Sequence, residues 1–185
     1  MALNRFYLPH SKTRQEFLAQ NIKCIFISHQ QKDKDHAQII ADYLMSAGLD
    51  VYFDKYDSDL RIHHQSGNPK KVTEAICSGI NNSSHMLVLV SPNTLSSTWV
   101  PFEIGYGFDK IELLVLCLKG IEKGSLPEYI RSAPIIRDIW DLNNKVSFWG
   151  DKSLEQLTKA NVIPEYSSLQ NPLRHVMDSL IIDNY

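Results

Sequence analysis

Residues 86–107 read MLVLVSPNTLSSTWVPFEIGYG and carry the clearest structural signal in the chain. The first five, residues 86–90, are all apolar and come before a Ser-Pro-Asn turn, which is typical of a strand buried on both faces of a parallel sheet. A helix is expected next, because Ser97 or Thr98 can act as N-cap and a proline is tolerated in the first helical turn. The stretch therefore predicts a strand that is followed directly by a helix.

Trp99 and Glu103 lie four residues apart on this expected helix. Such spacing brings an indole and a carboxylate to one helix face, near the carboxyl end of the preceding strand, where open α/β sheets bind ligands. A structural interpretation stands beside this one, since Trp99 could simply pack on the sheet and Glu103 could be a solvated charge. Spacing alone leaves both interpretations open.

The composition indicates one globular domain without a polyanionic partner. The chain has 185 residues, 43% of them hydrophobic, so it can bury a sizeable core. Its formal net charge of −2 favours neither nucleic acid nor a membrane surface as partner. The N-terminus lacks the apolar core of a signal peptide, and no run approaches a membrane span. The three cysteines have no metal-ligand spacing, so we expect a cytoplasmic protein with reduced thiols.

Strand and helix signals alternate along the chain. The expected strands are residues 24–27, 49–53, 86–90, 111–118 and 135–140. Helices are expected between them, the first ending at Gly48, and a last helix should follow Asn171-Pro172. The apolar stripe of this last helix would be Leu173, Val176, Met177 and Leu180. The alternation predicts the α/β class, with a doubly wound, mostly parallel sheet of about five strands and right-handed crossovers.

Two functions that use this architecture lack their signature residues here. A phosphorelay receiver would have an acidic pair after the first strand and an aspartate after the third, where this chain has Ser28-His29 and Ser91-Pro92. A dinucleotide fold of the Rossmann type would have a glycine-rich turn after its first strand, whereas Gly105-Tyr106-Gly107 ends a helix. Neither function is therefore expected.

Neither a metal site nor a nucleophilic triad is indicated. Asp57, Asp59 and the pair His63-His64 could be imagined as a metal cluster, but adjacent histidines point apart in an extended chain. Ser96-Ser97 has no base at a fixed spacing that could activate a hydroxyl group. We therefore expect no bound metal.

Four groups of residues together form a more specific pattern. They are Ile25-Phe26-Ile27-Ser28-His29 with Asp35, Val51-Tyr52-Phe53-Asp54, Gly67 with Ile76-x3-Ile80, and the run from Met86 to Pro92 with Ser97-x-Trp99-x3-Glu103. On these residues the chain resembles the TIR (Toll/interleukin-1 receptor) domains, particularly the bacterial stand-alone type of Thoeris anti-phage defence. The resemblance covers about residues 23–140 and implies a flavodoxin-like, doubly wound parallel sheet.

The resemblance also implies roles for particular residues. Glu103 takes the position of the glutamate with which catalytic TIR domains cleave NAD, and residues 54–67 (DKYDSDLRIHHQSG) correspond to the BB loop of the family. The expected substrate-binding residues are Ser28, His29, Asp54 and Trp99. No cofactor is expected, because NAD is itself the substrate.

Three functions stay open on the sequence. The leading hypothesis is a TIR NAD+ glycohydrolase or cyclase, which cleaves the nicotinamide N-glycosidic bond to give nicotinamide and ADP-ribose or a cyclic ADP-ribose-type signal in anti-phage defence. The alternatives are a non-catalytic TIR interaction or adaptor module and a nucleoside deoxyribosyltransferase-like enzyme. Since only a TIR-like unit is visible, a separate effector protein activated by the product would carry the signal onward.

The domain organisation follows from the same pattern. We expect an N-terminal leader or arm over residues 1–21, a TIR-like domain over residues 22–142, and a C-terminal helical extension over residues 143–185 that packs on the same domain. The mixed aromatic, aliphatic and arginine content of residues 54–67 favours an interface, so we expect a homo-oligomer formed through this loop.

Overall fold

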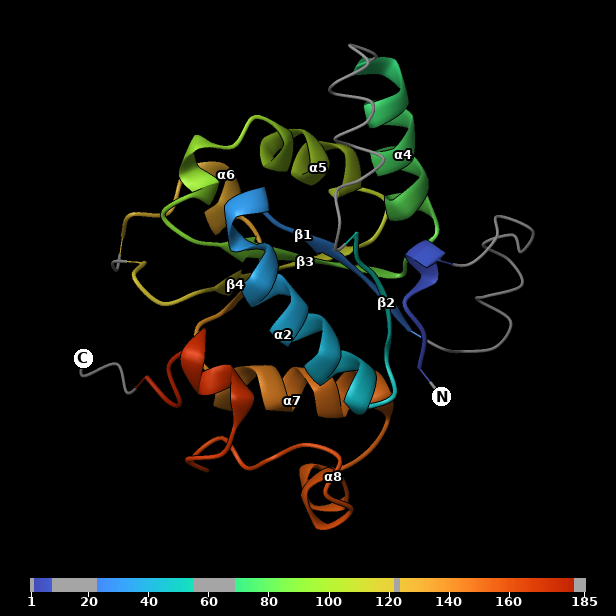
Figure 1. Ribbon diagram of the computed structural model, residues 1–185. Helices are drawn as coiled ribbons and strands as arrows, with labels where there is room; N and C mark the ends of the chain where they lie inside the picture. The colour runs from blue at the N-terminus through green and yellow to red at the C-terminus, as the bar shows by residue number, and fades with distance from the viewer. Residues whose placement is uncertain (1, 8–22, 55–68, 122–123, 182–185) are drawn as a thin grey trace.

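A single parallel sheet of five strands organises the structure, a computed structural model that describes residues 2–7, 23–54, 69–121 and 124–181 (Figure 1). The strand order is β2-β1-β3-β4-β5, with every neighbouring pair parallel. The strands are β1 (Cys24–Ser28), β2 (Asp50–Tyr52), β3 (His85–Val90), β4 (Glu112–Cys117) and β5 (Ile135–Ile136). The expected α/β class and flavodoxin-like sheet are confirmed.

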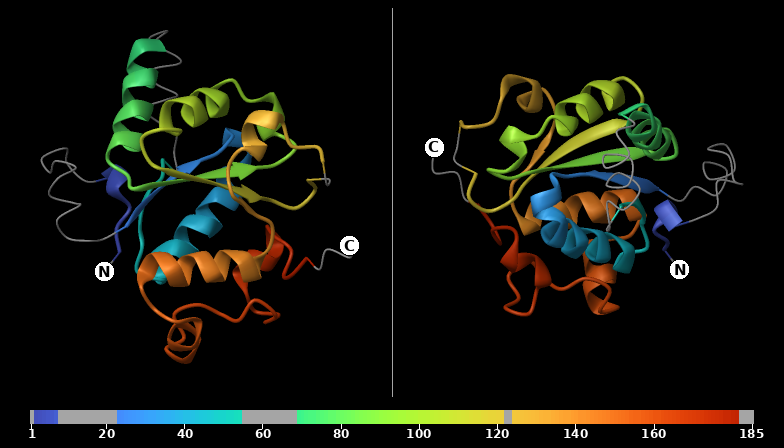
Figure 2. Two further views of the ribbon diagram at one scale, coloured as in Figure 1. Left: turned by 180° about the vertical axis from the view of Figure 1, so that it is seen from behind. Right: turned by 45° about the horizontal axis from the view of Figure 1, so that its top comes forward.

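Helices cover both faces of this sheet, as Figures 1 and 2 show. One face carries α2 (Lys34–Ser46) and α7 (Ile139–Gly150), with α8 (Leu154–Lys159) beside α7. The other face carries α4 (Pro69–Asn81), α5 (Trp99–Gly107) and α6 (Glu128–Arg131). Short 3-10 helices complete the described part of the chain: η1 (Arg5–Tyr7), η2 (Gln31–Asp33), η3 (Thr94–Ser96) and η4 (Pro172–His175).

Alternate residues of the central strands contribute to two separate cores. In β3, Leu87 and Leu89 belong to the core beneath α2 and α7. Met86, Val88 and Val90 belong to the core beneath α4 and α5. All five side chains are fully buried, which explains why the strand is a continuous apolar run rather than an alternating one.

The helix between the first two strands ends where the sequence predicts. Ala37, Ile40 and Leu44 are completely buried against the sheet. Gly48 follows the helix with φ of 92°, the left-handed conformation that glycine adopts without steric cost. This sharp stop starts β2 only two residues later.

The expected strand over residues 135–140 is wrong after its first two residues. Only Ile135–Ile136 pairs with β4, and Trp140 lies inside α7. The change occurs at Asp138, whose side chain accepts the N–H of Asp141 at 2.8 Å and so caps the new helix. The residues after Asp138 are compatible with a strand or a helix, and the cap favours the helix.

The expected C-terminal helix is also wrong in extent. Asn171 acts as N-cap, as predicted, but only the single 3-10 turn of η4 follows. The chain then runs beside the start of α7, where the Asp178 carbonyl accepts the N–H of Ile139 at 2.8 Å. Because the Asp178 carbonyl accepts this hydrogen bond, it does not accept one within a continued helix. Leu180, the last residue of the expected apolar stripe, is 43% exposed.

The C-terminal helical segment shares its core with the sheet. Trp149 of α7, Leu157 of α8 and Leu173 of η4 are buried in the same cluster as the residues of α2. The expected division between residues 142 and 143 falls inside α7. In the part of the chain that the structure describes, no helix has the length and apolar character needed to cross a membrane.

Candidate active site

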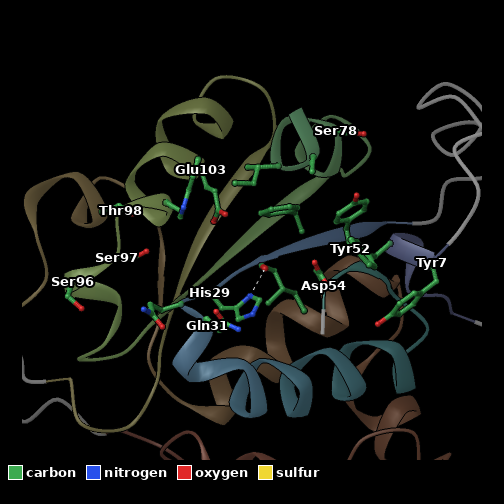
Figure 3. A pocket seen from close by; sticks show the side chains of 17 residues that line it. Tyr7, His29, Gln31, Tyr52, Asp54, Ser78, Ser96, Ser97, Thr98 and Glu103 are labelled. Atoms are coloured by element: carbon green, nitrogen blue, oxygen red, sulfur yellow. Dashed lines mark hydrogen bonds between the residues drawn. The ribbon is translucent and has the colours of Figure 1, made fainter. Parts of the chain in front are cut away.

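A pocket of about 560 Å³ lies at the carboxyl ends of β1 and β2, beside the start of α5 (Figure 3). Its side chains come from η1, the ends of β1 and β2, and from η2, α4, η3 and α5. His29, Asp54, Trp99 and Glu103 all line it. The structure therefore brings together residues that are up to 74 positions apart in the sequence, at the sheet edge where the topology predicts a site.

Glu103 presents a buried carboxylate to this pocket. The residue is 8% exposed, and its Oε2 accepts a short hydrogen bond from the hydroxyl group of Ser28. Ser28 is the last residue of β1 and is 1% exposed, so it lies behind the carboxylate rather than in the pocket wall. This hydrogen bond fixes the orientation of a carboxylate that is itself largely shielded from water.

Trp99 is the first residue of α5 and lies one helical turn before Glu103. Its ring lines the pocket and also meets Phe102 edge to face, with centroids 6.0 Å apart. The indole is only partly buried in the core beneath α5. Packing and pocket lining are thus both present in this one side chain.

His29 holds a neutral imidazole at the pocket. Its Nδ1 lies 3.2 Å from the carbonyl oxygen of Ile27 (dashed line in Figure 3), and because a carbonyl only accepts, Nδ1 must carry the hydrogen. Burial lowers the pKa of His29 below its usual value of 6.5, against smaller opposing effects of that carbonyl and of Asp33. In the neutral ring, Nε2 is therefore the acceptor nitrogen.

Asp54 follows β2 and is placed by the N-terminal segment. The Asn4 side chain donates to the carbonyl of Phe53 at 2.7 Å and accepts the N–H of Phe53 at 3.1 Å. This two-point contact fixes the backbone immediately before Asp54. Figure 3 shows Asp54 on the same side of the pocket as Tyr7 and Tyr52.

A buried aspartate joins two of the segments that line the pocket. Asp33, at the end of η2, accepts hydrogen bonds from Ser91 Oγ at 2.5 Å and from Asn93 Nδ2 at 2.7 Å. Ser91 and Asn93 begin the connection that leads through η3 to Trp99. In the sequence Asp33 reads as a charge at a helix start, and its side chain makes no such capping bond.

Several lining residues are absent from the sequence-based set. They include Phe6, Tyr7, Gln31, Tyr52, Ser78 and Ser96. The sequence signal that could have indicated Tyr52 is its position at the end of a strand, two residues before Asp54. No signal pointed to Phe6 or Tyr7, because their position depends on contacts with residues far along the chain.

The part of residues 54–67 that follows Asp54 lies outside the described residues. This applies to the expected oligomer interface and to Asp57, Asp59, His63 and His64, at which no bound metal is expected. Assembly through this loop stays a prediction.

The strand order and the pocket at the carboxyl ends of the strands define a flavodoxin-like α/β domain with a buried carboxylate in its site. A family model described as TIR domain matches residues 25–158. Since the match covers well over half of the chain, the protein belongs to the TIR domain family. A comparison with curated proteins gave no match.

Proposed function

We propose that the protein is an NAD+ glycohydrolase or cyclase, which breaks the bond between nicotinamide and the adjoining ribose. The observation that carries this proposal is the buried carboxylate of Glu103, oriented by Ser28 and exposed to a pocket of about 560 Å³. That volume lies within the range of small-molecule sites. Catalytic members of the TIR family use a glutamate at the matching position.

The chemistry explains why a carboxylate is needed. The nicotinamide of NAD+ is a cationic ring that leaves as a neutral molecule and takes the electron pair of the broken C–N bond. Positive charge then develops on the ribose, as in glycoside hydrolysis. A carboxylate held in a water-poor pocket stabilises that charge strongly, and Glu103 is nine-tenths buried at such a position.

Other pocket residues fit supporting roles in this reaction. Trp99 offers an aromatic wall one helical turn from Glu103, where it can position a flat ring. The acceptor Nε2 of His29 can take a proton from the group that attacks the ribose. Attack by water gives ADP-ribose, whereas attack by an atom of the same molecule gives a cyclic isomer.

We further propose a signalling role in the cytoplasm, with NAD as substrate and a separate effector protein as the receiver of the product. All three cysteines are free thiols in the structure, which fits a reducing compartment. The resemblance to Thoeris proteins supports a role in anti-phage defence. In this role the protein would assemble as a homo-oligomer through residues 54–67.

The direct test is incubation of the purified protein with NAD+, followed by chromatography of the products. We expect nicotinamide together with an equal amount of ADP-ribose or of a cyclic isomer. Intact NAD+ after incubation at high protein concentration would contradict the proposal. That result would favour the adaptor function, in which Glu103 has no chemical role.

A further inference from the structure

The N-terminal residues 2–7 form part of the pocket rather than a separate arm. Asn4 pairs with Val51 in a parallel bridge, and the N–H of Val51 donates to the carbonyl of Leu3 at 3.0 Å. The segment thus extends the sheet beyond β2, its edge strand. The turn of η1 then carries Phe6 and Tyr7 to the pocket wall.

A buried ion pair holds this segment in place. Arg5 Nε lies 2.8 Å from Asp50 Oδ2, and the two side chains are only 4% and 5% exposed. Asp50 also accepts the backbone N–H of Leu3 at 2.8 Å, and Arg5 donates to the carbonyl of Asn82 at 3.3 Å. Buried charges are tolerated only when paired and hydrogen-bonded in this way, so the segment has one well-defined position.

Four aromatic rings continue from this anchor along one side of the pocket. Tyr7 meets Phe6 edge to face at 5.2 Å, and Phe6 meets Tyr52 in the same manner at 5.8 Å. Tyr52 in turn stacks on Phe26 at 5.9 Å. Gly79 of α4 allows this close approach, because a Cβ there would lie 2.5 Å from the Tyr52 ring.

The aromatic residues and the hydroxyl-bearing residues of η3 and the turn after it lie on opposite sides of the pocket. Figure 3 shows Tyr7 and Tyr52 across the pocket from Ser96 and Thr98, with Glu103 between the two groups. Tyr7 is 54% exposed, so part of its ring is open to a ligand. A flat apolar surface is therefore available at a distance from the carboxylate.

We propose that Tyr7, with Phe6 and Tyr52 behind it, binds the second planar ring of the substrate, the purine base of a dinucleotide. The identity of the ring rests on the proposed function: NAD has two heterocycles, and the one that leaves belongs at the end of the pocket where Glu103 and Trp99 lie. Stacking on an aromatic side chain is the common way to hold a nucleobase without hydrogen-bond readout. The N-terminal segment is thus a specificity element of the site.

Binding of ADP-ribose, measured by titration calorimetry, tests this proposal without any turnover. We expect Tyr7→Ala to weaken binding about tenfold, the size typical of one lost stacking contact. Tyr7→Phe should retain the parent affinity, because the ring is kept. The matched control is Tyr129→Ala, since Tyr129 is 43% exposed on α6 and does not line the pocket. Equal affinity of Tyr7→Ala and parent, or no binding by the folded parent, would overturn the proposal.

A substrate comparison adds a second readout and separates the two proposals. Nicotinamide mononucleotide has the scissile bond but lacks the purine, so Tyr7→Ala should raise KM for NAD+ about tenfold and leave KM for the mononucleotide unchanged. An equal rise for both substrates would contradict the purine surface. If the parent cleaves neither substrate, the proposed function fails, while the calorimetric result still decides whether Tyr7 binds a base.

Discussion

At the scale of single residues, Glu103 could have a structural role, through its hydrogen bond with Ser28, or a chemical role, through its charge. A substitution that removes only the charge distinguishes the two roles. Glu103→Gln keeps the size of the side chain and one oxygen that can accept from Ser28, but removes the charge. We expect the rate of NAD+ cleavage to fall at least a hundredfold, about 3 kcal/mol of lost charge stabilisation, with the melting temperature close to that of the parent.

The measurement is nicotinamide release at saturating NAD+, together with a thermal melt of each protein. Glu128→Gln is the control, because the Glu128 side chain is 94% exposed on α6. A Glu103→Gln variant with the parent rate would show that the carboxylate takes no part in the reaction.

The half-buried imidazole of His29 gives a second expectation, which concerns stability. The pKa of His29 is lowered in the folded protein, so below its usual value of 6.5 the unfolded chain binds more protons than the folded one. The free energy of unfolding should therefore fall as the pH drops from 7 to 5. Denaturant titrations at each pH should show a smaller fall for His29→Gln than for the parent.

The control for this series is His36→Gln, since His36 is exposed on α2. His85, whose pKa burial also lowers, stays in every variant and contributes the same fall throughout. Parallel pH curves for His29→Gln and parent would mean that the ring of His29 titrates in the folded state as it does in the unfolded chain.

At the scale of elements, the hydrogen bonds of Asp33 connect the turn after β1 with the segment that precedes α5. Asp33→Ala removes the acceptor of both Ser91, whose hydroxyl group is buried, and Asn93, whose amide is half-buried. We expect a loss of about 1 to 3 kcal/mol in the free energy of unfolding. KM for NAD+ should also rise, because Trp99 follows directly on this connection.

Asp35→Ala is the matched control, since Asp35 is exposed in the first turn of α2. A surface change of this kind should alter stability by no more than about 0.5 kcal/mol. Equal free energies of unfolding for the two variants would show that the hydrogen bonds of Asp33 do not stabilise the fold.

Elements with local signals were predictable from the sequence. β3 and α5 follow from a continuous apolar run and from the spacing of Trp99 and Glu103, and both lie where expected. The end of β5 was not predictable, since the change to α7 depends on a cap at Asp138 and on pairing with Asp178. The sequence predicted that Glu103 lies near the carboxyl ends of the strands. It did not predict the aromatic side of the pocket.

At the scale of the whole molecule, the C-terminal segment completes one of the two cores. We expect a chain that ends at residue 142 not to fold, because it loses Trp149, Leu157 and Leu173 from the cluster that also contains α2. Truncating a single large core side chain typically costs about 2 to 5 kcal/mol, and a whole domain has only about 5 to 15 kcal/mol.

Circular dichroism during heating is the measurement, with a full-length chain alongside. The expected result is the absence of a cooperative transition in the truncated chain. A cooperative melt at a similar temperature would show instead that residues 1–142 are stable without the extension.

The ion pair of Arg5 has a consequence for the order in which the site is completed during synthesis. Arg5 leaves the ribosome early, but Asp50 lies 45 residues further along the chain, and Asn82 lies 77 residues further along. The segment cannot dock in full until β2, α4 and Asn82 have been translated. The carboxylate of Glu103 is therefore still to be translated when the aromatic side of the pocket first becomes able to form.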